Sequence, residues 1–289
     1  MTLVLLAPWT AIAHMVSHAF VRDALLAGSA VAVASGLVGY FVTLRGQVFV
    51  GDALSHVAFT GSLAALLVGA DLRIGLFGSC IVFGLVMAAL GVKGRPDDTV
   101  VGAVFAWILG LGALFLTLYT TSRAGADATG GVNVLFGSIF GLSSAQAQAA
   151  AVIAVLVIAT VVILRRPLLF ASIDEAVAEA RGVPVRALGF AFLAVVGITA
   201  AEATEAVGAL LLLGLLAAPA ATAHRLTTRP PVAMWLSAAL ALGSTWAGLA
   251  LAYAAPQVPP SFGIVAVATG CYLASVLATA GRRSGIVVR

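Results

Sequence analysis

The sequence predicts an all-α, polytopic membrane protein with eight or nine transmembrane helices. Of its 289 residues, 62% are hydrophobic and only 9% are charged, and the mean hydropathy is +1.14. A soluble domain cannot bury that much apolar surface. The apolar stretches are long and uninterrupted, whereas the strands of a membrane β-barrel alternate with period two. The composition therefore indicates a helical bundle in a bilayer, and we interpret the net charge of +4 as a topological signal, with no affinity for nucleic acid.

Seven apolar stretches are long enough to cross about 30 Å of hydrocarbon as helices. They are Ala24–Leu44, Ala53–Gly69, Ile74–Val92, Val100–Thr120, Gln148–Leu164, Val232–Ala254 and Phe262–Ala280. A further stretch, Leu188–Ala223, is interrupted by Glu202 and Glu205 and is too long for one span but short for two. We expect two shorter helices there, meeting in a turn around Ala201–Ala206. The count is then nine segments, or eight if this pair counts as one.

The distribution of Lys and Arg sets the expected orientation, because these residues accumulate in cytoplasmic loops. If the loop at Arg165–Arg186 is cytoplasmic, all of the 15 Lys and Arg residues except Arg22, Arg73 and Arg123 lie inside. With nine segments, the N-terminus is outside and the C-terminus is cytoplasmic. Residues 1–23 then form an extracytoplasmic or interfacial segment, 24–281 the transmembrane domain, and 282–289 a basic cytoplasmic tail.

Asp52 and His56 stand four residues apart in the apolar string Gly51-Asp52-Ala53-Leu54-Ser55-His56. On a helix this spacing places both side chains on one face. Ionisable residues inside a membrane segment mark an ion or substrate path, and a carboxylate with an imidazole suits a divalent transition metal. The alternative is structural: Asp52 caps the helix, and His56 is a buried neutral imidazole. Because His56 lies about 18 Å from the helix end near Val68, at mid-bilayer depth, we favour the metal path.

A polar segment from Asp174 to Pro184 occupies the largest predicted cytoplasmic loop. Its helix formers end at Gly182, which fits a C′ position, with Pro184 just beyond. The segment is either an exposed amphipathic helix or a coupling helix that docks on a separate motor subunit. The sequence contains no Gly-x-x-x-x-Gly-Lys-Ser/Thr phosphate loop. We therefore expect that, if ATP drives transport, another polypeptide hydrolyses it and this chain is not an enzyme.

Several motifs resemble the membrane subunits of zinc/manganese-type ABC importers, and they occur in that family's order. They are Gly51–His56, Asp98–Gly102, Leu135-Phe136-Gly137, the Asp174-x-x-x-Ala178-x-x-x-Gly182-Val183 loop, and Val207–Leu211 continuing to Pro219–Ala221. The Gly-Asp-Ala-Leu-Ser-His string is the most specific of them. Together the motifs extend over the chain from about Ala24 to Ala280.

The resemblance implies a type II ABC importer permease of the bacterial plasma membrane. It implies a homodimer of permeases, two cytoplasmic ABC ATPase subunits that bind the ATP, and an extracytoplasmic metal-binding protein. The transported ion would be Zn²⁺ or Mn²⁺, with Fe²⁺ as a third candidate, and no cofactor would be permanently bound. Asp52 and His56 match the metal path, and the ATPase-coupling loop carries Asp174, Glu175, Ala178 and Gly182.

The Glu202/Glu205 pair falls outside the resemblance, and Ser138 stands where the family usually has Asp. The two glutamates form an electronegative mouth, contribute metal ligands, or are simply hydrated at the interface; we favour the mouth. Two rival functions also remain. A siderophore or cobalamin permease would need no Asp-x-x-x-His pair, and a secondary metal carrier would need no ATPase.

Overall fold

The computed structural model describes residues 17–122, 139–209, 212–255 and 257–284. Every regular element in these ranges is a helix. The long ones are α2 (Ala19–Leu44), α3 (Val48–Leu67), α4 (Leu72–Leu90), α5 (Asp98–Ser122), α7 (Ser144–Ile173), α9 (Val185–Val207), α10 (Leu212–Leu226), α11 (Pro230–Ala254) and α12 (Pro260–Ser284). The short ones are the 3₁₀ turn η1 (Ile139–Gly141) and α8 (Glu175–Ala180).

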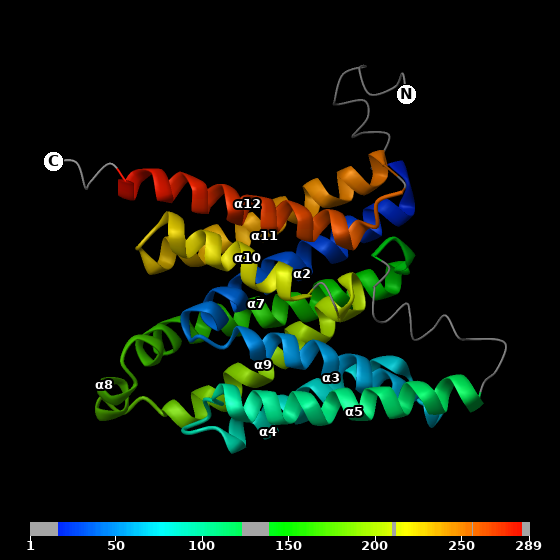
Figure 1. Ribbon diagram of the computed structural model, residues 1–289, viewed down its shortest axis with the longest axis horizontal. Coiled ribbons are helices and arrows are strands. Elements are labelled where there is room, and N and C mark those ends of the chain that lie inside the picture. The colour runs from blue at the N-terminus through cyan, green and yellow to red at the C-terminus, as the bar shows by residue number, and fades with distance from the viewer. Residues whose placement is uncertain (1–16, 123–138, 210–211, 256, 285–289) are drawn as a thin grey trace, which may run out of the picture.

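The helices run back and forth along the long axis of the molecule (Figure 1). Within the described ranges, eight of them are long and apolar enough to cross a membrane, and α10, with 15 residues, is the shorter ninth. Helix α2 begins at the end opposite α8, and α12 finishes at the end where α8 lies (Figure 1). We call this second end the α8 end. The prediction of an all-α polytopic fold with eight or nine segments is confirmed.

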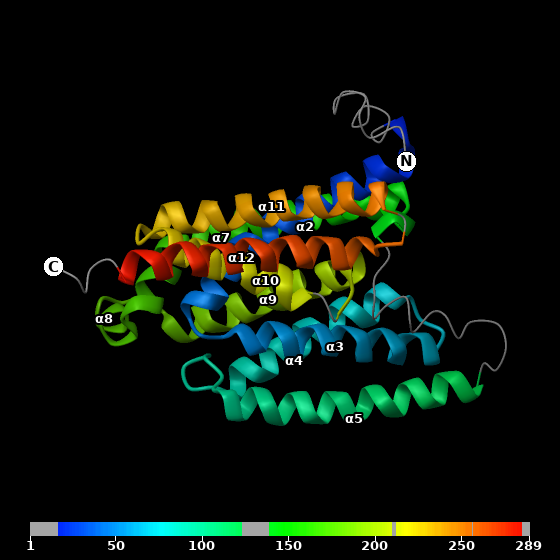
Figure 2. The ribbon, with the colours of Figure 1, turned by 45° about the horizontal axis from the view of Figure 1, so that its top comes forward.

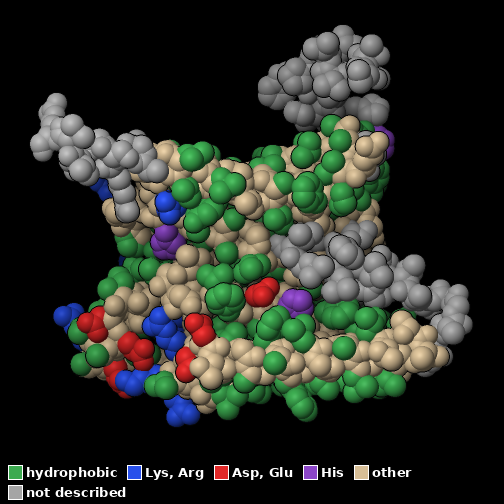
Figure 3. All heavy atoms as spheres, viewed as in Figure 1, with side chains coloured by type: hydrophobic (Ala, Val, Ile, Leu, Met, Phe, Trp, Pro, Cys, Tyr) green, Lys and Arg blue, Asp and Glu red, His purple; other side chains and the backbone are tan. Residues whose placement is uncertain are grey.

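Three helices form the buried centre of the bundle. In α2, α3 and α9, 72% of the most apolar window is buried, against 22–28% in α4, α5, α7 and α12. Figure 2 shows α3, α4 and α5 as one group and α2, α7, α11 and α12 as another, with α9 and α10 between them. The outer helices present apolar side chains along their length, whereas charged side chains gather at the α8 end (Figure 3). This distribution suits a bundle whose flanks face lipid.

Small residues allow close helix contacts, as is common in membrane bundles. A Cβ atom added to Gly39 of α2 would lie 2.0 Å from the backbone oxygen of Leu216 in α10. A Cβ added to Gly61 of α3 would lie 2.4 Å from the backbone oxygen of Gly75 in α4. Neither position accepts a larger residue without moving a helix, so these glycines fix the positions of α2 and α3.

The predicted turn at Ala201–Ala206 is wrong. Helix α9 continues through both glutamates to Val207, and Gly208, with φ of +101°, ends it. Ala and Glu are strong helix formers, and only glycine adopts such a φ easily. The chain therefore breaks at the glycine and not at the charged residues. The first helix of this pair is a full-length span and only the second, α10, is short.

Candidate functional site

Helix α3 carries both Asp52 and His56. It begins at Val48, with Gln47 in the capping position and no side-chain cap, so it starts one turn earlier than its apolar stretch. Asp52 therefore lies inside the helix, and the interpretation of Asp52 as an N-cap is wrong. The i,i+4 spacing now places the carboxylate and the imidazole on one face of an observed helix.

Neither side chain has a partner among the described residues. The Asp52 carboxylate forms no hydrogen bond with a described residue, and the Ser55 hydroxyl donates to the Asp52 backbone oxygen at 2.7 Å. The ring of His56 makes an edge contact with Phe105 of α5, with 5.1 Å between ring centroids, and no hydrogen bond to a described residue. Both residues are half-buried. An ionisable pair left free at this depth is available to an ion or to water.

A pocket of about 360 Å³ opens between α3 and α5 beside Asp52. Asp98, the first residue of α5, lines it together with Asp52, so two carboxylates face the same space. The remaining lining residues are Phe49, Val101, Gly102 and Phe105. Within the described ranges, no group of three or more His, Cys, Asp or Glu residues is placed to hold a metal.

The predicted coupling segment forms a short helix closed as its sequence indicates. The Asp174 carboxylate accepts a hydrogen bond from the Val177 backbone amide at 2.9 Å, and Gly182 follows the helix with φ of +82°. The Val183 amide donates back to the Ala178 carbonyl at 3.0 Å, which closes the helix end. Ala178 is fully buried, whereas Asp174 is exposed and Glu175 is half-buried. The segment is thus anchored on one side and open on the other.

Polar contacts join this segment to α3 through the α4–α5 turn. Lys93, the only lysine of the chain, forms an exposed ion pair with Glu179 of α8, and this hydrogen bond raises the pKa of the ammonium. In the same turn, Arg95 donates from Nη2 to the backbone oxygen of Arg45 at 2.5 Å. Arg45 donates from Nε to Oε1 of Gln47 at 3.0 Å, directly before α3.

Arg45 is the buried member of these contacts. Its side chain is 5% exposed, and its guanidinium lies 5.0 Å from the centre of the Phe192 ring in α9. Burial, with the nearby charge of Arg95, lowers the pKa of Arg45 to about 10, so it stays charged at neutral pH. The charge is held by an aromatic face and a side-chain amide. These contacts connect α8 to the start of α3 through the α4–α5 turn.

The two glutamates of α9 differ in environment. Arg73 of α4 donates from Nε and Nη2 to Oε1 of Glu205, at 2.8 and 2.7 Å. Glu202 is 4% exposed, and its Oε2 has no hydrogen-bond partner among the described residues. Neither is a freely hydrated interfacial side chain, and the charge of Glu205 is balanced by Arg73. This arrangement weighs against the electronegative mouth.

A model of the ABC 3 transport family matches residues 17–279. The chain belongs to the ABC 3 transport family. The family explains why the motifs quoted from the sequence occur in a fixed order, and it confirms the resemblance to membrane subunits of metal-type ABC importers.

Named relatives of this ABC 3 permease include two manganese transport system membrane proteins, both called MntC. The protein from Listeria innocua is 31% identical over 83% of this chain and 84% of its own. The protein from Halalkalibacterium halodurans is 29% identical over 82% of this chain and 80% of its own. Among solved structures, PsaBC from Streptococcus pneumoniae, in complex with Fab, superposes with a TM-score of 0.79 at 25% identity, covering 93% of this chain and 95% of that one.

Three contacts of this ABC 3 permease were not predicted as parts of the site. They are the position of Asp98 beside Asp52, the pairing of Arg73 with Glu205, and the pairing of Lys93 with Glu179. Each joins residues far apart in the sequence. The Asp98–Gly102 motif was the one available signal, since it shares the family pattern with Gly51–His56.

Proposed function

We propose that this chain is the membrane permease of an ATP-driven importer of a divalent transition metal, with Mn²⁺ as the favoured ion. The observation that carries the proposal is the free carboxylate of Asp52 and the free imidazole of His56 on one face of α3, beside a pocket that a second carboxylate lines. Oxygen and nitrogen donors of this kind suit Mn²⁺, Zn²⁺ and Fe²⁺. The names of the relatives favour manganese among the three.

A homodimer is part of the proposal, because one chain presents only part of a coordination shell. A two-fold axis near Asp52 and His56 brings a second Asp–His pair to the same ion. Two cytoplasmic ABC ATPase subunits bind the ATP and dock on α8, where Asp174 and Glu175 lie outside the core and Ala178 anchors the helix. An extracytoplasmic metal-binding protein delivers the ion at the opposite end, in the plasma membrane of a bacterium.

The ligand types explain binding better than they explain selectivity. A site that contains imidazole binds Zn²⁺ more tightly than Mn²⁺ when geometry is equal. Preference for manganese then has to come from coordination number, from site geometry or from the ion supplied by the binding protein. An ion that inhibits Mn²⁺ uptake but is not itself transported would show directly that binding and transport have different selectivity.

The test is metal uptake by the complex, reconstituted in liposomes with its ATPase and binding protein. Mn²⁺, Zn²⁺ and Fe²⁺ are supplied singly and in competition, and Asp52→Asn and His56→Gln are compared with the unmodified chain. Each variant removes a ligand from a path of low dielectric constant, so we expect at least a tenfold loss of uptake, equivalent to about 1.4 kcal/mol or more. Assembly with the ATPase should be unchanged.

Asp71→Asn is the matched control. Asp71 caps α4 by accepting a hydrogen bond from the Arg73 amide at 2.7 Å, and asparagine keeps that acceptor. The change removes one negative charge at a site remote from the pocket, and uptake should stay near that of the unmodified chain. Normal uptake by both Asp52→Asn and His56→Gln would refute the site. Uptake that continues without ATP would instead favour a secondary carrier.

A further inference from the structure

The hydroxyl of Thr60 forms a hydrogen bond between two helices. Thr60 lies in α3, and its hydroxyl donates to the backbone oxygen of Ile108 in α5 at 3.2 Å. A threonine inside a helix more often bonds back to a carbonyl one turn earlier in the same helix. Six others in the described ranges do so, namely Thr117, Thr120, Thr160, Thr199, Thr222 and Thr245. The bond of Thr60 therefore bears on how α3 and α5 are placed relative to each other.

Thr60 continues the face of α3 that carries Asp52 and His56. The three residues stand at intervals of four, so their side chains lie on one side of the helix. That side follows α5. The ring of His56 contacts Phe105, and Thr60 reaches Ile108 about one turn further along. At 1.5 Å per residue, the Thr60 bond lies about 12 Å along α3 from Asp52.

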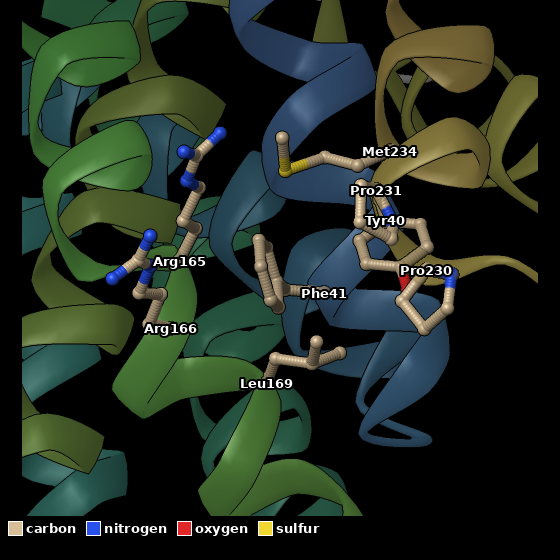
Figure 4. Close-up of a pocket in the computed structure, with 8 residues that line it drawn as sticks. All are labelled: Tyr40, Phe41, Arg165, Arg166, Leu169, Pro230, Pro231 and Met234. Carbon is tan, nitrogen blue, oxygen red and sulfur yellow. The ribbon is translucent and has the colours of Figure 1, made fainter.

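The pocket beside Asp52 has one carboxylate on each of these two helices. Asp52 belongs to α3 and Asp98 to α5. A different pocket, of about 240 Å³ between α2, α7 and the start of α11, has no acidic residue in its lining (Figure 4). The separation of α3 and α5 thus decides how far apart the two carboxylates stand. A bond between these helices therefore affects an ion held in the pocket beside Asp52.

Helix α5 depends on α3 for its position. It lies at the edge of the bundle beside α3 in both ribbon views (Figures 1 and 2), and it packs chiefly on that helix. Only 22% of its most apolar window is buried, against 72% for α3. A helix with so little surrounding structure is held by few contacts, so one direct bond to α3 has a measurable share in placing it.

The bond is shielded from water and closely fitted. Thr60 is 4% exposed, and the neighbouring Phe59 and Leu63 pack in an apolar cluster with Phe115 of α5. A hydrogen bond in such surroundings is stronger than one in water. A Cβ atom added to Gly112 of α5 would lie 2.8 Å from the Thr60 hydroxyl oxygen. The absence of a side chain at this position lets the two helices approach.

We propose that Thr60 is a positioning residue for the metal site. Its hydroxyl holds α5 against α3 and so fixes the distance between Asp98 and Asp52. This inference rests on the proposed function, because the role of Thr60 lies in binding of the transported ion. Without the bond, α5 is less well ordered before the ion arrives, and part of the free energy of ion binding is then used to order it.

Thr60→Val tests the role, because it removes the hydroxyl and nearly keeps the shape of the side chain. The Ile108 carbonyl stays within the helical part of α5. In the reconstituted complex, we expect the Mn²⁺ concentration for half-maximal uptake to rise about two- to tenfold, the range that one hydrogen bond supplies. Maximal uptake should change little. Hydrogen–deuterium exchange in the first turns of α5 should increase.

Two further variants separate the bond from a general effect on folding. Thr60→Ser keeps the hydroxyl and should restore most of the uptake at limiting Mn²⁺ and most of the protection of α5. Thr245→Val is the matched control. Thr245 is 1% exposed and bonds to Ala241 within its own helix, so both measurements should stay near those of the unmodified chain.

A double-mutant cycle with Asp98→Asn tests whether Thr60 acts through Asp98. If it does, the loss of the hydroxyl matters less once the carboxylate is gone, and the combined effect is smaller than the product of the single effects. Independent effects would overturn the role of Thr60, as would unchanged half-maximal uptake or unchanged exchange in Thr60→Val. Failure of the unmodified complex to take up metal would instead refute the proposed function itself.

Discussion

Asp98 stands beside Asp52 in one pocket, so two carboxylates line the same space. Asp52 has the imidazole of His56 on its own helix face, whereas Asp98 is exposed at the start of α5. These different surroundings indicate different roles for the two carboxylates. Under the proposed function, Asp52 would coordinate the ion, and Asp98 would stabilise it through its field.

Replacing Asp98 with Asn should therefore weaken binding of the ion at Asp52 more than maximal transport, because the field of Asp98 acts on an ion that is already in the pocket. A unit charge roughly 4 Å from an ion in a wet site contributes about 1 kcal/mol, or roughly fivefold in apparent affinity. The measurement is initial uptake at limiting and saturating Mn²⁺, at low and high salt. The loss should shrink at saturating metal and in high salt, because screening removes the field.

Asp97→Asn is the neighbouring control for this experiment. Asp97 accepts a hydrogen bond from the Val100 amide at 2.8 Å, does not line the pocket, and asparagine retains the acceptor. A loss at Asp98 that persists at saturating metal and in high salt would make Asp98 a ligand, contrary to the proposed role.

The Arg73–Glu205 ion pair predicts that the loss of one partner lowers the stability of the fold. The side chain of Glu205 is 14% exposed, and its Oε1 accepts hydrogen bonds from Nε and Nη2 of Arg73. Arg73→Gln leaves a shielded carboxylate without its charged donor and should cost about 1–3 kcal/mol of stability. Arg73→Gln/Glu205→Gln removes both charges and should recover part of that loss. Thermal unfolding in detergent gives the double-mutant cycle, and a coupling energy near zero would show that the pair contributes nothing.

At the scale of elements, α8 ends in a conformation that glycine alone adopts easily. Gly182 has φ of +82°, and nothing lies within 4 Å of a Cβ added there. Gly182→Leu therefore acts through backbone strain of about 1–2 kcal/mol and through bulk on the open side of the segment. Metal-stimulated ATP hydrolysis and uptake should separate, or the ATPase should be lost on purification. Gly182→Asn tolerates the left-handed region better and should be milder.

Gly69 provides a matched control for this effect. It follows α3 at the opposite end, has φ of +73°, and is equally open. Gly69→Leu imposes similar strain far from α8. If both variants uncouple ATP hydrolysis from transport equally, the effect is a general loss of stability and α8 is only an exposed helix.

For the whole molecule, the nine long helices of the described residues place the start of α2 and the end of α12 at opposite ends (Figure 1). The charged side chains gather at the α8 end (Figure 3), which the positive-inside rule assigns to the cytoplasm. Reporter fusions should therefore locate the C-terminus in the cytoplasm and the N-terminus outside. Both termini on one side of the membrane would contradict nine crossings.

The sequence by itself determined the class of protein, because composition and the length of apolar runs follow from the thickness of the bilayer. It also determined local features that depend on neighbouring residues. Asp52 and His56 share a helix face because of their spacing, and Gly182 terminates α8 because its position requires a positive φ. The family motifs identified the type of transporter, which the match over residues 17–279 confirms.

Local patterns misplaced the boundaries where composition was uniform. The break after α9 lies at Gly208 and not at the two glutamates, because charge in an alanine-rich segment does not disfavour helix. The start of α3 lies at Val48, one turn before its expected position, so the polar Asp52 falls inside the helix.

Only the tertiary structure decided which distant residues meet. Asp98 joins Asp52, Arg73 neutralises Glu205, and Lys93 holds Glu179, although 46, 132 and 86 residues separate the partners in the sequence. The periodicity of a sequence indicates the face of a helix on which a residue lies. The helix that packs against that face is set by contacts across the whole bundle.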